Sequence, residues 1–416
     1  MVQAPAFTFA GGNLRKVISA PLYAIGRLAS LLSRRDPSLW VIGSAFGVAD
    51  GALAFARAAD TLSPRPRLVW LGTDAGEVEA AKRAGFEAYL KSSAAGVRHT
   101  LRAGLVVITH GFGDVNRYGV DGAVVVQLWH GAPLKKVQAD SLAVFSAGPG
   151  RIPGMAARMR AAYRRSNSRI SLLPTSSGVF RASLVSAFTL DESRVRVLGE
   201  PRSDLLFAGS RDTRMAASRA TLSAHLGDLG DRRVLLYAPT WRNGEADPAI
   251  PGEADWELIE QFCERHDCLF VVRPHRLGVG DYSYTSDRVR LLTADQQMES
   301  MPLLWGLSAL ITDYSSMLVD YVVTGEPLVL LAPDLEHYRA TRGLYINYDE
   351  LAGGRWYRTW TDVVGRLDDL FSDPGQLAAA QQHSQALAER FHTHTDGRSA
   401  ERVAAAAAEL VARRFT

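Results

Sequence analysis

The chain has 416 residues, of which 47% are hydrophobic and 22% are charged. This length exceeds what one hydrophobic core usually supports, so we expect two domains, and the composition excludes a disordered chain. The formal net charge of +3 is too small to indicate nucleic-acid binding, and we expect no nucleic-acid partner.

The first segment of the chain is amphipathic. From Leu14 to Arg35, leucine, valine and isoleucine recur at roughly helical spacing among basic residues. Such a helix can lie in the headgroup layer of an anionic membrane, but a helix packed on the protein's own core has the same periodicity. Both interpretations stay open. We expect neither a secretory signal nor a transmembrane helix, and two cysteines favour a reducing compartment.

Short apolar runs then alternate with longer helical patterns, which is typical of parallel α/β sheets. The strands expected in the first half are residues 40–42, 67–71, 105–109, 124–128, 170–174 and 195–198. Those expected in the second half are residues 234–238, 269–273, 288–291, 309–312 and 328–331. Residues 207–231 are expected to form one helix and the interdomain link, with a boundary near residue 225. The fold class predicted is therefore α/β, with two doubly wound domains facing across a cleft.

Ligands bind such sheets at the carboxyl ends of the strands, and polar motifs do follow the expected strands. His130 comes after residues 124–128 and precedes Gly131 and a helix-starting Pro133, which predicts a tight turn exposed to the cleft. Lys135 and Lys136 in a first helical turn would oppose the helix dipole, which hints at an anion. The alternatives are a histidine satisfied by a backbone carbonyl and lysines on a solvated face.

The second half repeats this arrangement after three strands. The motifs are Thr240-Trp241-Arg242, Arg273-Pro274-His275 and the pair Ser315-Ser316, which stands where a strand meets a helix. Cations and hydroxyls that converge at one helix terminus suit a pyrophosphate, so a nucleotide-diphosphate ligand is the leading hypothesis. An ordinary serine N-cap and arginines paired with carboxylates are the alternatives.

These motifs resemble the signature set of the CDP-glycerol glycerophosphotransferase family, the teichoic acid primases and polymerases. The five motifs are Leu128-Trp129-His130-Gly131-x-Pro133-Leu134-Lys135-Lys136, Gly199-x-Pro201-Arg202-x-Asp204, Tyr237-Ala238-Pro239-Thr240-Trp241-Arg242, Arg273-Pro274-His275 and Ile311-Thr312-Asp313-Tyr314-Ser315-Ser316. The resemblance extends from about Trp40 to Tyr348. Ala132 replaces a small hydroxylic residue and Ala49–Ala52 replaces an expected polar run, and both departures could alter acceptor or polyol choice.

The resemblance implies a glycosyltransferase-B-like fold of two Rossmann-like domains and a peripheral enzyme on the cytoplasmic face of the cell membrane. It implies transfer of a polyol phosphate from CDP-glycerol or a related CDP-polyol to an undecaprenyl-diphosphate-linked saccharide or growing polymer, with release of CMP. The expected segments are a membrane-associating segment (1–36), an acceptor domain (37–225), a CDP-donor domain (226–395) and a C-terminal helix packed on the first domain (396–416).

The resemblance also implies residue roles. His130 would be the catalytic base, while His275, Ser315 and Ser316 would contact the donor pyrophosphate. Thr240, Arg242, Arg273 and Asp313 are further candidate donor-binding residues, and Lys135, Lys136, Arg202 and Asp204 are possible acceptor or phosphate contacts. No strand end carries an Asp-x-Asp pair suited to magnesium, so we expect neither a metal nor another cofactor.

Two other functions remain open from the sequence. A sugar transferase or nucleotide-sugar epimerase can use the same two-domain fold, because a fold does not define a reaction. A non-catalytic membrane-surface scaffold with a vestigial nucleotide cleft would account for the amphipathic segment, but not for His130 and His275 together. Release of CMP from a CDP-polyol would support the polyol-phosphate transferase, whereas release of UDP or epimerisation of a UDP-sugar would support the sugar transferase or epimerase.

Overall fold

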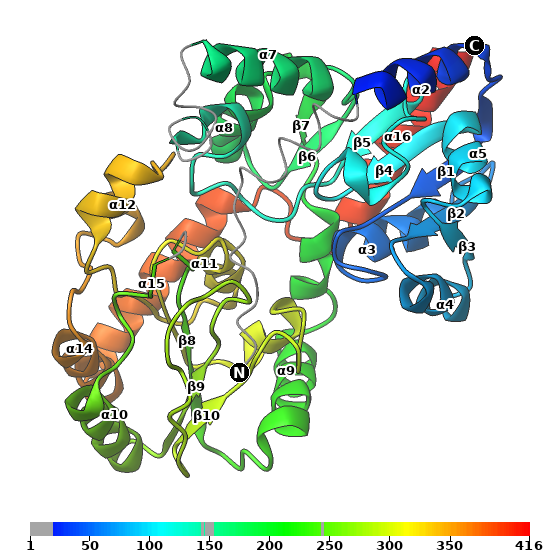
Figure 1. Cartoon of the computed structure of the whole chain (residues 1–416). Coiled ribbons are helices and arrows are strands. Elements are labelled where there is room, and N and C mark those ends of the chain that lie inside the picture. Colours follow the sequence, from blue (N-terminus) through cyan, green and yellow to red (C-terminus); the bar gives the residue numbers. More distant parts are fainter. Residues whose placement is uncertain (1–19, 143–144, 146–153, 243–244) are drawn as a thin grey trace. The chain divides into compact units, whose positions relative to one another are not determined.

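The computed structural model describes residues 20–142, 145, 154–242 and 245–416. They form two compact units, each built on its own parallel sheet (Figure 1). The first-sheet unit contains residues 20–132, 137–204 and 392–416. The second-sheet unit contains residues 133–136 and 205–391.

The first sheet has the strand order β3-β2-β1-β4-β5, and every neighbouring pair is parallel. Its strands are β1 (Asp36–Ile42), β2 (Arg67–Gly72), β3 (Glu87–Leu90), β4 (Ala103–Ile108) and β5 (Val124–Gln127). All residues of β4 and β5 are buried, because helices cover both faces of a parallel sheet. The doubly wound fold predicted from the sequence is confirmed, although the edge strand β3 was not predicted.

Several helices surround this sheet. They are α3 (Asp50–Ala59), α4 (Ala75–Arg83), α5 (Ala94–Arg102), α7 (Met155–Asn167), α8 (Gly178–Phe188) and α16 (Ser399–Phe415). A two-stranded sheet of β6 (Leu173–Thr175) and β7 (Val195–Val197) belongs to the same unit. The start of α4 follows local rules, since Asp74 Oδ1 accepts from Glu77 N at 2.9 Å. The alanine-rich α16 returns to pack on α3 and β5 through Val403 and Val411.

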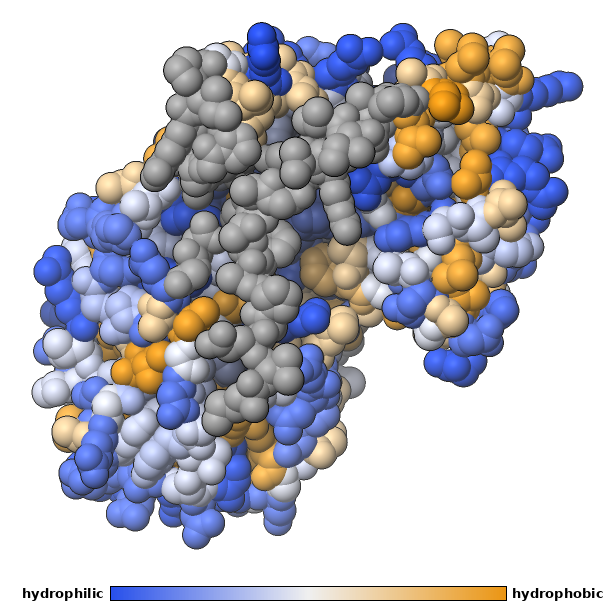
Figure 2. All heavy atoms as spheres, viewed as in Figure 1, coloured by the Kyte–Doolittle hydropathy of each residue, from blue (hydrophilic) through white to orange (hydrophobic). Residues whose placement is uncertain are grey.

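Helix α2 (Ala20–Leu32) carries the described part of the amphipathic segment, and residues 14–19 lie outside the described residues. Its apolar side chains point away from the core, with Leu22, Ile25, Leu28, Leu31 and Leu32 between 50% and 80% exposed. Figure 2 shows hydrophobic residues at the surface where Figure 1 draws α2. The alternative of a core-packed apolar face is therefore wrong for this helix. Among the described residues, no helix has the length and hydropathy needed to cross a membrane.

The opposite side of α2 packs closely on the first-sheet unit. A Cβ on Gly26 would lie 2.3 Å from the carbonyl oxygen of Tyr118, so only glycine allows this approach. The rings of Tyr23 and Tyr118 meet edge to face with centroids 4.9 Å apart. The face of α2 that carries Gly26 and Tyr23 is thus the one packed on the first-sheet unit.

The second sheet repeats the first topology, with order β10-β9-β8-β11-β12 and only parallel pairs. Its strands are β8 (Arg233–Ala238), β9 (Cys268–Val272), β10 (Val289–Leu291), β11 (Ala309–Thr312) and β12 (Leu328–Leu330). The surrounding helices are α9 (Arg211–Leu226), α10 (Glu253–Arg265), α11 (Met317–Tyr321), α12 (Leu335–Thr341), α13 (Tyr348–Leu351), α14 (Trp360–Ser372) and α15 (Pro374–Phe391). Trp256 and Phe262 of α10 share a core cluster with Trp360 and Leu367 of the neighbouring α14 (Figure 1).

The division between the units falls at Asp204–Leu205, earlier than the boundary predicted near residue 225. Helix α9 belongs to the second-sheet unit because it packs on a short helix at Met301–Gly306. A Cβ on Gly306 would lie 2.7 Å from Leu222 Cδ1, and Trp305 Nε1 donates to the carbonyl of Leu206 at 3.0 Å. These contacts could not be read from the polar sequence of α9.

Candidate functional site

His130 follows β5 on a strained turn. Trp129 adopts the left-handed conformation with φ of 61°, and Gly131 follows with φ of 126°. A left-handed non-glycine residue costs about 1–2 kcal/mol, so surrounding contacts must hold it. Gln127 Oε1 accepts from Trp129 N at 3.1 Å, and the indole packs edge to face on Phe188. The turn predicted at this strand end is present.

The surroundings of the His130 ring define its tautomer. Nδ1 lies 3.4 Å from the carbonyl oxygen of Thr109, which can only accept a hydrogen bond. Nδ1 therefore carries the hydrogen, and Nε2 keeps a lone pair. The ring stacks on His110 with centroids 5.0 Å apart and lies near Phe46 at 5.7 Å. A half-buried imidazole in this tautomer can accept a proton from a hydroxyl through Nε2.

The residues that support His130 were missed from the sequence. Asp114 Oδ2 accepts from the backbone of Thr109 at 2.9 Å and of His110 at 2.7 Å, and Gln127 Nε2 donates to the His110 carbonyl at 3.3 Å. The available signal was a second His-Gly pair, His110-Gly111, directly after an apolar strand. The two His-Gly turns follow the adjacent strands β4 and β5.

Arg202 and Asp204 do not join His130. Asp204 accepts from the backbone N–H groups of Ser399 and Ala400, both at 2.7 Å, at the start of α16. Arg202 lies between two carboxylates, 3.4 Å from Asp50 and 3.7 Å from Glu200. The contact of these two residues with acceptor or phosphate stays a prediction. The motif anchors the last helix of the unit.

In the second-sheet unit, Arg242 occupies the centre of a buried ion cluster. Nη1 contacts Asp313 at 2.9 Å, while Nε and Nη2 contact the two carboxylate oxygens of Asp334 at 2.8 and 2.9 Å. The guanidinium also lies 5.1 and 5.0 Å from the ring centroids of Tyr314 and Tyr338. Arg242 and Asp313 therefore pair with one another, and their predicted role as direct donor contacts stays a prediction.

This cluster positions Thr240. Asp313 Oδ1 accepts from Thr240 N at 2.9 Å, which holds the end of β8 beside the end of β11. The Thr240 side chain is only 4% exposed, and its hydroxyl has no hydrogen-bond partner among the described residues. A buried hydroxyl without a partner costs free energy, so Thr240 Oγ1 marks a place where a ligand atom would be stabilising.

Ser315 and Ser316 stand between β11 and α11, as predicted. Ser316 makes no side-chain capping bond, whereas Ser315 Oγ accepts from Met317 N at 3.3 Å. Helix α11 has only five residues, so its dipole contributes little. Both serines are half-buried near Thr240 through the pairing of β8 with β11.

Arg273 and His275 follow β9 but differ in role. Arg273 is buried, and its guanidinium donates to backbone carbonyls including Thr293 at 3.4 Å and Met298 at 3.0 Å. Arg273 thus holds a loop, and its predicted role in donor binding stays a prediction. His275 Nδ1 accepts from Leu277 N at 3.1 Å, so the neutral ring carries its hydrogen on Nε2. Desolvation by the surrounding atoms, together with the positive charges of Lys135 and Arg276, lowers the pKa of His275 to about 4.

Lys135 and Lys136 belong to the second-sheet unit and lie in extended backbone, where the sequence predicted a helix. Lys135 forms an antiparallel bridge with Leu344, and Lys136 N donates to the Gly343 carbonyl at 3.0 Å. Desolvation lowers the pKa of Lys135 to about 8, with a further contribution from Arg342. The charged form of Lys135 is destabilised by desolvation, and His275 nearby is neutral. Such a site suits an anionic ligand, which would stabilise the charged lysine.

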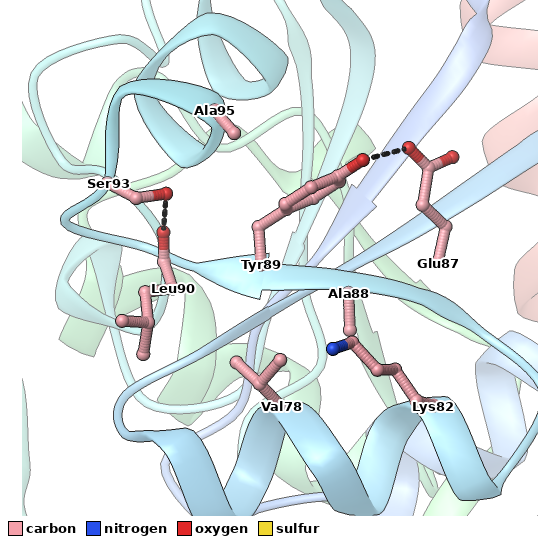
Figure 3. A pocket seen from close by; sticks show the side chains of 8 residues that line it. All are labelled: Val78, Lys82, Glu87, Ala88, Tyr89, Leu90, Ser93 and Ala95. Carbon is pink, nitrogen blue, oxygen red and sulfur yellow. Dashed lines mark hydrogen bonds between the residues drawn. The ribbon is translucent and has the colours of Figure 1, made fainter.

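Two further observations bear on other sites. A cavity of about 550 Å³ lies beside the edge strand β3, lined by Val78, Lys82, Tyr89 and Ser93 among others (Figure 3). Its Tyr89 hydroxyl donates to Glu87, and none of the predicted site residues lines it. Among the described residues, no three His, Cys, Asp or Glu side chains gather closely enough to hold a metal ion.

Comparisons with known proteins agree with the motifs. The family model for CDP-glycerol:poly(glycerophosphate) glycerophosphotransferase matches residues 28–408. The teichoic acid poly(glycerol phosphate) polymerase of Staphylococcus epidermidis is 27% identical over 283 residues, which cover 66% of this chain and 37% of that polymerase. The teichoic acid glycerol-phosphate transferase of Staphylococcus aureus is 25% identical over 287 residues, covering 67% of this chain and 69% of that transferase.

This chain spans less than half the length of two of these relatives. It matches 37% of the S. epidermidis polymerase and 41% of the teichoic acid ribitol-phosphate polymerase TarK of S. aureus. The solved structure of the wall teichoic acid polymerase TagF has a TM-score of 0.73 and 22% identity, covering 99% of this chain and 100% of that chain. This likeness shows the same fold. The chain belongs to the CDP-glycerol:poly(glycerophosphate) glycerophosphotransferase family.

Proposed function

We propose that the chain transfers glycerol phosphate, or a related polyol phosphate, from a CDP-activated donor to a hydroxyl of a lipid-linked saccharide or growing polymer. The acceptor oxygen attacks the phosphorus that bears the polyol, the bond from that phosphorus to the CMP oxygen breaks, and CMP leaves. The reaction would serve synthesis of a teichoic-acid-like polymer. It rests on one observation above all, the opposite tautomers of His130 and His275.

The two tautomers suit different tasks. His130 presents a lone pair at Nε2 and would take the proton of the acceptor hydroxyl, a contribution of about 10²–10⁴ in rate. His275 presents an N–H at Nε2 and, with a pKa of about 4, would donate a hydrogen bond to a donor phosphate oxygen without becoming a base. Phosphoryl transfer requires mainly this kind of positioning and charge stabilisation.

Three further groups of the second-sheet unit would complete the phosphate site. Thr240 Oγ1 would donate the hydrogen bond that it lacks among the described residues, and Lys135 would supply a positive charge. Ser315 and Ser316 would add hydroxyl and backbone donors. Arg242, Arg273 and Asp313 would position these groups through the contacts described above. We also propose that the charge of Lys135 serves where other phosphotransferases use a metal ion.

The names of the relatives support this substrate class. They include polymerases of glycerol phosphate and of ribitol phosphate, and a TagF variant has been soaked with CDPG. A panel of CDP-glycerol, CDP-ribitol and UDP-sugars, with a lipid-linked disaccharide as acceptor, tests the proposal. We expect CMP release from a CDP-polyol. Release of UDP, or epimerisation of a UDP-sugar, would instead favour the sugar transferase or epimerase.

We further propose that α2 rests on an anionic membrane surface, which is where a lipid-linked acceptor would be found. Five exposed apolar side chains on one short helix are unfavourable in water, and each would gain about 1–2 kcal/mol on burial among lipid chains. The double substitution Leu28→Glu and Leu31→Glu should release the protein from vesicles. The double substitution Leu90→Glu and Leu205→Glu, at exposed leucines outside α2, adds the same two charges and is the matched control.

A further inference from the structure

A cavity rich in arginine lies in the first-sheet unit and takes no part in the proposed reaction. Its volume is about 510 Å³, and its charged lining consists of Asp121, Arg169, Arg194, Arg196, Arg413 and Arg414. Five guanidinium groups and one carboxylate leave four positive charges, more than the net charge of +3 for the whole chain. A cavity with such a lining attracts anions strongly.

The cavity lies at the opposite end of the sheet from His130. Asp121 to Ala123 precede β5, and Arg194 precedes β7, so these lining residues stand at the amino ends of their strands. His130 follows the carboxyl end of β5. Because neighbouring strands are parallel, the cavity and the His130 turn lie at different edges of the fold, and the cavity needs its own ligand.

Two of the five arginines have structural partners. Arg169 Nε pairs with Asp121 at 2.7 Å, and Arg194 Nη1 donates to the carbonyls of Ser168 at 2.7 Å and Ile170 at 2.9 Å. Each keeps further N–H groups available, since a guanidinium carries five. Both side chains are therefore fixed along the cavity wall before any ligand binds.

The other three arginines have no such explanation. For Arg196, Arg413 and Arg414, no ion pair or side-chain hydrogen bond is present within the described residues. Arg413 and Arg414 complement the carboxyl end of the α16 dipole, which accounts for a cation there. That does not account for Arg196, which lies on β7 and faces the same cavity. Five guanidinium groups gathered around the single carboxylate of Asp121 repel one another unless an anion joins them.

The cavity lies near the segment that follows α2. Arg35, just beyond this helix, donates to the carbonyls of Gly119 at 2.9 Å and of Asp121, which lines the cavity. The charges of Arg35 and Arg414 also repel one another, which places the end of α16 near the same point. An amphipathic helix lies in the membrane interface at the depth of the lipid headgroups. The cavity is thus close to the segment that follows the carboxyl end of α2, the helix with the exposed apolar face.

We propose that this arginine-lined cavity binds the phosphate headgroup of an anionic phospholipid while α2 lies in the membrane surface. The choice of a lipid rests on the membrane association proposed above, and it is independent of the transfer reaction. Bidentate guanidinium groups match phosphate oxygens, and the apolar side chains of α2 would lie beside the acyl chains of the same leaflet.

The test uses the full chain and vesicles of phosphatidylcholine with or without phosphatidylglycerol at constant ionic strength. The triple variant R196Q/R413Q/R414Q should bind phosphatidylglycerol vesicles at least about tenfold more weakly than the wild type. The control R65Q/R83Q/R98Q loses the same three charges from exposed sites on the first-sheet unit and should lose less than about threefold. An equal loss in both triples would mean that total charge decides binding, and it would overturn the proposal.

A second variant separates a built site from a diffuse positive surface. R196K/R413K/R414K keeps every charge but removes the planar forks, and it should weaken binding at least about threefold. Wild-type binding by this variant would overturn the proposal. Monomeric dihexanoyl phosphatidylglycerol should displace the wild type from vesicles, whereas inorganic phosphate at equal ionic strength should not. Displacement by both to the same extent would identify a free-phosphate site and refute the lipid assignment.

Catalysis is measured alongside with a soluble acceptor. CMP release should be unchanged in all three triple variants, because the cavity is remote from His130 and belongs to a different unit from His275. Loss of CMP release in the glutamine triple alone would place the cavity in the reaction and overturn the inference. If the wild type releases no CMP from any donor but the vesicle results hold, the proposed reaction fails and the lipid site stands.

Discussion

The lowered pKa of Lys135 predicts an unusual dependence of donor capture on pH. Desolvation and Arg342 bring this pKa from the ordinary 10.5 to about 8, against a smaller opposing effect of Asp313. With a pKa of about 8, Lys135 is about nine-tenths protonated at pH 7 and about one-tenth protonated at pH 9. If only the ammonium form binds the donor pyrophosphate, kcat/KM should fall about tenfold between these pH values.

The assay is CMP release at low CDP-polyol concentration from pH 6 to 10, because kcat/KM reports groups of the free enzyme. Bound phosphates stabilise the ammonium, so kcat should hold to higher pH than kcat/KM. The variant K135R stays charged throughout and should lose the alkaline fall. A wild-type kcat/KM that is level from pH 7 to 9, or the same fall in K135R, would refute the assignment.

The same shift has a consequence for stability. Lys135 has a lower pKa in the folded chain than in the unfolded chain, so its positive charge disfavours folding. This destabilisation is complete below pH 8, where both states are charged, and it is absent above about pH 10.5, where both are neutral. A shift of this size corresponds to about 3 kcal/mol. The variant K135M should therefore raise the free energy of unfolding at pH 7 by up to about 3 kcal/mol while losing donor capture, as denaturant titrations would measure. A destabilised K135M would contradict this reasoning.

Three other predictions follow from the site. His130→Ala should lower kcat by about 10²–10⁴ with donor binding nearly unchanged in calorimetry, and loss of donor binding would remove His130 from the base role. His275→Ala should raise the KM for the donor, and His275→Asn should restore part of the donor affinity through its amide N–H. Because the pKa of His275 is about 4, titration of this histidine should cause no change in kcat/KM between pH 5 and 9. Transfer should persist in EDTA, and a loss that added Mg²⁺ restores would show a metal requirement.

Much of the scaffold could be predicted because apolar runs and helical periodicities are local properties. The exception is β3, whose sequence Glu-Ala-Tyr-Leu has no apolar run and lies at the sheet edge. The extended pairing of Lys135 with Leu344 was missed for the opposite reason. It depends on a contact between segments far apart in the chain, whereas Pro133 followed by lysines favours a helix by local rules alone.

The roles of the charged motifs were harder to predict than their positions. An arginine at a strand end can bind a phosphate or a carboxylate, and the sequence shows the arginine without showing its partner. Arg242 meets Asp334, and Asp204 meets the start of α16 at Ser399, across long stretches of chain. His130 differs because it and its carbonyl partner Thr109 come directly after two adjacent strands, β5 and β4. Its place at a strand end could therefore be predicted from the apolar run before it.

Arg242 offers a sharp test of this distinction between positioning and binding. Its fork joins Asp313 and Asp334 in a buried setting, so R242M leaves two carboxylates without their partner and should cost about 3–5 kcal/mol of stability. R242K keeps the charge but cannot span both carboxylates, so it too should lower the denaturation midpoint, and it should weaken donor binding through displacement of Thr240. A direct phosphate ligand would behave otherwise, because R242K would then keep wild-type stability and raise only the KM for the donor. Midpoints and donor KM measured on the same preparations decide between the two roles.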